Sequence, residues 1–98
     1  MYDLRGFRSW LITDRQVYPA VATKRANALH EVLVDIDDIG TDEGVQRGFD
    51  LMEMGLHIRD LKAREAAWKL FSVWAKEQGV YIPLPDLRLV YTRRARNM

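Results

Sequence analysis

Lysines recur at regular intervals along residues 56–79, and this is the pattern in the sequence best suited to chemistry. Lys62, Lys69 and Lys76 stand seven residues apart. On an α-helix this spacing places all three on one outer face. A row of ammonium groups on a helix face is suited to contacting the phosphates of a nucleic-acid backbone. Glu65 stands four residues before Lys69, so an intrahelical ion pair on a solvated face is the competing interpretation.

The acidic run 35–43 superficially resembles a calcium-binding loop. Its fifth and twelfth positions lack the oxygen ligand and the bidentate Glu that such a loop needs, so we interpret the run as a solvated loop or a docking patch for a basic partner. His30 and His57 are far apart in sequence, and no Cys completes a zinc site. No glycine-rich phosphate loop, paired-carboxylate motif or Ser-His arrangement is present. We therefore expect no catalytic site, no cofactor and no metal.

Composition indicates a single domain. The chain has 98 residues, of which 48% are hydrophobic, enough to bury a core without disulfides. No apolar run is long enough to span a membrane, and the N-terminus lacks the apolar core of a signal peptide, which favours an intracellular, cytoplasmic protein. The net charge of +1 conceals an asymmetry. Residues 1–54 carry six Lys and Arg against ten Asp and Glu, whereas residues 55–98 carry nine against four. This asymmetry indicates either an anionic partner for the second half or two solvated faces that partly neutralise each other.

Hydrophobic periodicity predicts four helices. Asp3 is a good cap for the first, Pro19 suits the first turn of the second, and Thr41 or Asp42 caps the third. Gly79 ends the fourth. The predicted ranges are approximately 3–15, 20–35, 42–54 and 56–79.

The fourth predicted helix carries an aromatic inner stripe, and Trp68 lies at its edge. Partly exposed aromatic side chains are favoured at interfaces, so Trp68 is a candidate anchor for a protein partner. The segment 86–98 is ambiguous. Leu87, Leu89 and Tyr91 alternate as in a strand, whereas the proline just before this segment is equally compatible with a short helix. We treat 86–98 as a basic C-terminal tail on a helical domain formed by residues 1–85.

Four phrases along the chain carry a resemblance to a known family. They are Phe7-Arg8-Ser9-Trp10-Leu11, the turn from Arg15 to Ala20, the stretch from Ile39 to Val45, and a final series of Arg64, Ala67, Phe71, Trp74, Ala75, Gly79 and Ile82. In this order and spacing they resemble the N-terminal core-binding domain of phage integrases, the tyrosine recombinases, whose fold is called SAM-like. The likeness covers about residues 4 to 83. It departs from the family at Tyr18 and at Asp60, where Ser or Thr is usual. The resemblance implies an all-α orthogonal bundle of four helices.

The resemblance also implies a DNA contact surface, because the second and fourth helices of that family lie across DNA. The residues that it maps there are Lys24, Asn27, Lys62, Arg64, Lys69 and Lys76. The basic tail would add phosphate contacts through Arg93, Arg94 and Arg96, or would act only as a solubilising end. The family's catalytic domain has no counterpart here, and Tyr91 beside two arginines lacks the further groups that phosphoryl transfer requires.

These observations leave two functions open. The first is a non-catalytic domain that binds double-stranded DNA, either an accessory or free-standing relative of the integrase domain from a phage, plasmid or mobile element, or the first half of a longer recombinase. The second is a protein-interaction module or inhibitor of similar origin. It would dock through Asp37, Asp38, Asp42, Glu43 and Trp68. Neither function involves a membrane or a small-molecule substrate.

Overall fold

Five helices account for most of the described chain, one more than the sequence predicts. The computed structural model describes residues 3–96, and that part of the chain contains no β-strand. The helices are α1 (Leu4–Thr13), α2 (Pro19–Asp35), α3 (Asp42–Glu53), α4 (Ile58–Glu77) and α5 (Arg88–Arg96). The all-α prediction is confirmed, and the first four helices agree with the predicted ranges to within about two residues. No described helix is both long enough and apolar enough to cross a bilayer.

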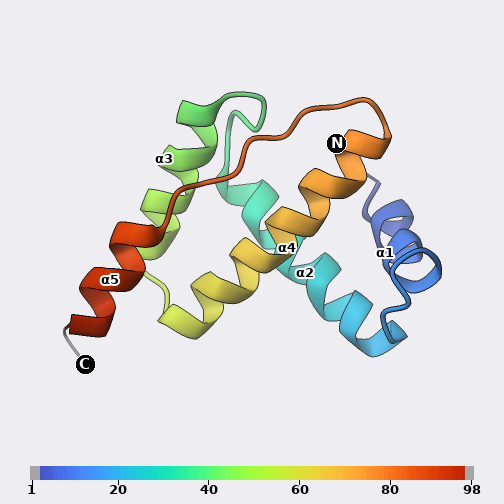
Figure 1. The fold of residues 1–98 in the computed structure, drawn as a ribbon, viewed down its shortest axis with the longest axis horizontal. Coiled ribbons are helices and arrows are strands. Elements are labelled where there is room, and N and C mark those ends of the chain that lie inside the picture. The colour runs from blue at the N-terminus through green and yellow to red at the C-terminus, as the bar shows by residue number, and fades with distance from the viewer. Residues whose placement is uncertain (1–2, 97–98) are drawn as a thin grey trace.

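Helix α2 is central to the packing, with α1 against one side and α4 against the other (Figure 1). The core is an aromatic series that joins three helices. Phe7 of α1 meets Phe71 of α4 edge to face, with ring centroids 6.4 Å apart. Phe71 contacts Trp68 at 5.2 Å, and Trp68 contacts Phe49 of α3 at 5.9 Å. All four rings are fully buried, so each contributes a large apolar area to folding.

Two of the helix starts have the caps that the sequence predicts, and a third has the predicted proline in its first turn. The Asp3 carboxylate accepts a hydrogen bond from the Arg5 amide, and the Thr41 hydroxyl accepts one from the Gly44 amide. Pro19 occupies the first turn of α2. At α4 the cap is His57, whose Nδ1 accepts from the Arg59 amide. Asp60 lies in the first turn of α4, where its negative charge interacts favourably with the positive end of the helix dipole.

The loop between α2 and α3 is held close to the start of α3. The Asp38 carboxylate accepts hydrogen bonds from the Gly40 amide and the Thr41 hydroxyl. A Cβ atom added to Gly44 would lie 2.2 Å from the carbonyl oxygen of Asp38. Glycine is thus required at position 44 by the close approach of two backbone segments.

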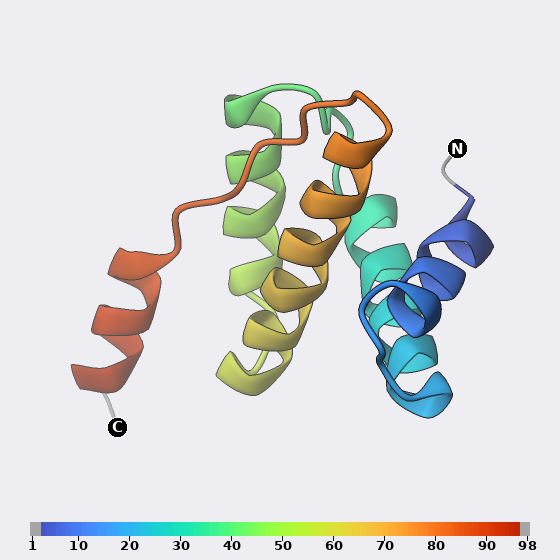
Figure 2. The same cartoon turned by 45° about the vertical axis from the view of Figure 1, so that its right-hand side comes forward.

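An extended segment, residues 78–87, runs back across α4 toward α3 (Figures 1 and 2). Gly79, with φ +83°, adopts the left-handed conformation that ends α4. The Trp68 indole donates a hydrogen bond to the carbonyl oxygen of Pro83, and the Ser72 hydroxyl donates one to that of Ile82. Gln46 of α3 bonds both the amide and the carbonyl of Asp86.

The basic segment expected as a tail contains helix α5, and this corrects the four-helix prediction. Asp86 caps α5 by accepting from the Arg88 amide. Leu87 and Val90 are buried in the core, so the helix is anchored on its inner side. Helix α5 lies at the end of the molecule opposite α1 (Figure 2). Residues 97 and 98 of the expected tail, and residues 1 and 2, are outside the described part.

Candidate nucleic-acid interface

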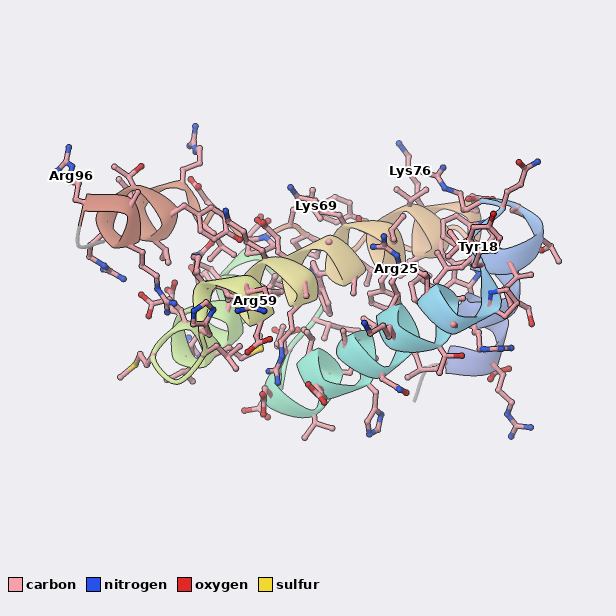
Figure 3. All side chains as sticks on the ribbon, turned by 90° about the horizontal axis from the view of Figure 1, so that it is seen from below. Tyr18, Arg25, Arg59, Lys69, Lys76 and Arg96 are labelled. Carbon is pink, nitrogen blue, oxygen red and sulfur yellow. The ribbon has the colours of Figure 1, made fainter. Side chains whose placement is uncertain are left out.

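One side of α4 carries four cationic side chains, which we call the basic face: Arg59, Lys62, Lys69 and Lys76. All four are exposed, because the buried residues of α4 lie on the opposite side of the helix. Figure 3 shows Arg59, Lys69 and Lys76 distributed along α4. At a rise of 1.5 Å per residue, the face extends about 26 Å from its first cation to its last. The three lysines predicted to share an outer face therefore do so.

None of these four cations forms an ion pair with any described residue. Between Arg59 and Lys76, α4 has two carboxylates, and both point off the basic face. Asp60 lines the groove between α4 and α2. Glu65 accepts a hydrogen bond from the Tyr91 hydroxyl of α5, with an oxygen–oxygen distance of 2.7 Å. The pair between Glu65 and Lys69 that the sequence offers is consequently not formed, and the positive charge is left available.

Helix α2 adds two cations beside this face. A groove between α2 and α4 has a mixed lining, which includes Lys24, Arg25, Asn27 and Glu31 of α2 and Asp60, Ala63, Arg64 and Ala66 of α4. Figure 3 shows Arg25 between the two helices. Its Nε is buried and has no hydrogen-bond partner in the described structure. The Arg25 side chain as a whole is only partly buried, so the guanidinium is a cation on the lining of this groove.

Arg25 was not among the DNA contacts predicted from the sequence, although it stands next to Lys24, which was. The signal that identifies it is its position on α2. Arg25 and Ala28, three residues apart, share the side that lines the groove with α4. Only the pairing of α2 with α4 shows that this side faces the groove.

Arg64 is not available to a phosphate, which corrects its mapping to the DNA surface. Its guanidinium lies 2.7 Å from the Glu31 carboxylate and 3.4 Å from that of Asp35, and its side chain is only 16% exposed. Arg64 lies on the side of α4 that meets α2, so it bridges the two helices. The bridge also neutralises part of the acidic end of α2, which otherwise would repel DNA.

The C-terminal arginines separate into two groups. Arg93 and Arg94 both pair with Glu53, a carboxylate at the end of α3. Arg94 also donates to the carbonyl oxygens of Glu53 and Leu56, so it caps the turn between α3 and α4. The structure therefore gives Arg94 a structural role. Arg96 is exposed and has no ion pair within the described chain (Figure 3).

Of the residues of the alternative docking site, Asp38, Asp42 and Glu43 line one surface pocket, but Trp68 does not reach the surface. Trp68 is fully buried among aromatic rings, so its assignment as an exposed anchor is wrong. The extended segment covers the edge of the stripe where Trp68 lies. Asp38 is engaged in the loop, as described above. Asp37, Asp42 and Glu43 are exposed.

Two further groups have shifted pKa values. Burial, reinforced by the hydrogen bond to Glu65, raises the pKa of Tyr91, so the hydroxyl remains a proton donor. Asp86 has a pKa lowered to about 2 by the hydrogen bond from the Arg88 side chain. The described residues contain no cluster of three or more His, Cys, Asp or Glu able to hold a metal ion.

Comparison with protein-family models, with curated proteins and with solved structures finds no match for this chain. The charge and geometry of the described surface are therefore the grounds for a functional assignment.

Proposed function

We propose that this protein binds double-stranded DNA without catalysing a reaction, through the basic face of α4 and the groove that α4 forms with α2. The observation that carries the proposal is the absence of ion pairs at Arg59, Lys62, Lys69 and Lys76 within the described chain. Exposed cations over about 26 Å reach several phosphates, since duplex DNA carries one charge per roughly 1.7 Å of axis. Binding then releases counterions, which supplies most of the affinity of such contacts.

Helix α2 is expected to add Lys24, Arg25 and Asn27 to this surface. Ala63 and Ala66 leave the groove wall low, so a sugar–phosphate ridge can approach the Arg25 guanidinium closely. An arginine can form two parallel hydrogen bonds with one phosphate, so Arg25 is better suited than Lys24 to a contact of defined geometry. The use of the second and fourth helices together agrees with the proposed relation to the integrase core-binding domain. We also propose that the fold is of the SAM-like type and that the chain is related to the integrase core-binding domain.

A protein-interaction function is the second candidate, supported by a separate observation. Asp37 borders an apolar groove between α1 and α2 whose lining includes Leu33, Val34 and Ile39. A partner segment with apolar and basic side chains would be complementary to it. We rank this function second, because the aromatic anchor it relied on is buried and the groove also contains Arg5 and His30.

Charge reversal on the basic face tests the first function. Lys62→Glu with Lys69→Glu is compared with Arg5→Glu combined with Arg47→Glu, a control pair on α1 and α3 with the same change in net charge. The readout is fluorescence anisotropy of a labelled duplex of about 30 base pairs, which is longer than the 40 Å extent of the protein. We expect the lysine pair to weaken binding roughly 100-fold and the control pair by no more than about 3-fold at physiological salt. Equal losses in the two pairs would exclude the basic face as the binding surface.

A further inference from the structure

Tyr91 of α5 contacts two charged residues of α4 at once. Its hydroxyl donates to Glu65 Oε1 at 2.7 Å, and the Lys62 ammonium lies 5.3 Å from the centroid of its ring. The first contact is a hydrogen bond to a carboxylate, and the second is within the range of a cation–π interaction. Lys62 belongs to the basic face, and Glu65 is a carboxylate that points off it.

The hydrogen bond determines which partner Glu65 has. Glu65 stands four residues before Lys69 and three after Lys62, so on a free helix its carboxylate would be within reach of both ammonium groups. The order Glu then Lys at this spacing is the more favourable one. In the structure Glu65 forms neither ion pair with these two lysines and is instead partly buried against α5.

We propose that Tyr91 is a positioning residue for DNA binding: by holding the Glu65 carboxylate against α5, it keeps Lys62 and Lys69 unneutralised on the basic face. This rests on the proposed function. Helix α5 then contributes to DNA binding through its docking rather than through Arg93 and Arg94, which are paired with Glu53. The contact requires a protonated hydroxyl, which any tyrosine has at neutral pH, and burial raises the pKa of Tyr91 further.

Buried residues next to Tyr91 hold it in place. Leu87 and Val90 anchor the inner side of α5, and Arg94, one turn after Val90, is bonded to the turn between α3 and α4. Tyr91 is thus presented to α4 by a docked helix. Removal of its hydroxyl alone leaves these anchors intact, which makes Tyr91→Phe a conservative test.

The experiment is a double-mutant cycle on Tyr91→Phe and Glu65→Gln, with Tyr81→Phe as the matched control. Tyr81 is 74% exposed and forms no hydrogen bond in the described structure, so its hydroxyl should be dispensable. Each protein is titrated with labelled duplex over a series of salt concentrations. We expect Tyr91→Phe to weaken binding about 3- to 10-fold and to make the salt dependence shallower by nearly one phosphate contact. In the Tyr91→Phe background, Glu65→Gln should restore both the DNA affinity and the salt dependence of binding.

The size of that rescue decides the role of Tyr91. Glu65→Gln removes a negative charge in any background, so it must improve affinity more in Tyr91→Phe than in the wild type. Equal gains in the two backgrounds would overturn the proposal, as would a Tyr91→Phe protein with wild-type affinity and salt slope. If Tyr91→Phe weakened DNA binding by unfolding the protein, Glu65→Gln would not restore binding. That result would also count against the proposal.

A second readout does not depend on DNA. The side-chain NMR signals of Lys69 in the free protein should shift in Tyr91→Phe, because the ammonium gains a carboxylate partner. The Lys69 signals should return to their wild-type positions when Tyr91→Phe is combined with Glu65→Gln, and they should remain unchanged in Tyr81→Phe. Unchanged Lys69 signals in Tyr91→Phe would overturn the positioning role, whereas wild-type protein that fails to bind DNA at low salt would overturn the proposed function.

Discussion

The indole nitrogen of Trp68 lies 2.8 Å from the carbonyl oxygen of Pro83, and this bond ties the extended segment to α4. Without that segment, the outer edge of Trp68 would be exposed and would form an aromatic surface patch. With it, Trp68 is buried between Phe71 and Phe49 and is part of the core. The same segment leads into α5, so the burial of Trp68 and the docking of α5 are connected.

Trp68→Phe should lower the free energy of unfolding by about 2–4 kcal/mol, because it leaves the Pro83 carbonyl without its donor and opens a small cavity. Trp10→Phe is the matched control. The Trp10 indole nitrogen is also buried but has no hydrogen-bond partner in the described structure, so its removal costs less. Urea denaturation of both variants measures the difference. Equal destabilisation would mean that the bond to Pro83 contributes nothing.

Arg94→Ala should destabilise the fold by about 2–4 kcal/mol, because Glu53, whose side chain is only 12% exposed, loses one of its two arginines and the carbonyl groups of Glu53 and Leu56 lose a donor. Arg96→Ala, at an exposed arginine that is the last described residue, should be nearly neutral. Thermal unfolding of the two variants tests this. If neither substitution lowered the unfolding temperature, Arg94 would not contribute to the docking of α5.

Docking of α5 also predicts a pH response at Asp86. The Arg88 side chain holds the pKa of Asp86 at about 2, below its ordinary value of 3.8. A depressed pKa means that the stabilisation from ionised Asp86 is complete above 3.8 and disappears as the pH falls through about 2. The start of α5 should therefore fray over this range. NMR titration of the Asp86 carboxyl carbon measures the pKa, which should rise toward 3.8 in Arg88→Ala. A titration that does not change in Arg88→Ala would contradict the assigned cause.

The first four helices could be predicted because their signals are local. Caps at Asp3 and Thr41, the proline at position 19 and the spacing of apolar residues such as Phe7 and Leu11 all act within one or two turns. Helix α5 could not be predicted from local signals of this kind. Leu87, Leu89 and Tyr91 alternate like a strand, and it is the burial of Leu87 and Val90 against distant residues that selects the helix.

The candidate site was predictable in part, for the same reason. Helical spacing is enough to place Lys62, Lys69 and Lys76 on one face. The roles of Arg64 and Arg25 depend on the pairing of α2 with α4, since Arg64 and Glu31 are 33 residues apart. Whether Lys69 is neutralised depends on a tyrosine 26 residues beyond Glu65, on a helix that local patterns did not identify.

The central claim is tested most directly by the salt dependence of wild-type binding to duplex DNA. We would measure anisotropy of a labelled duplex at several salt concentrations between about 50 mM and about 200 mM, and plot the logarithm of the association constant against that of the salt concentration. Four or five phosphate contacts predict a slope of about −3 to −5. Absence of binding even at the lowest salt, or a slope near zero, would contradict the account and would direct attention to the apolar groove between α1 and α2.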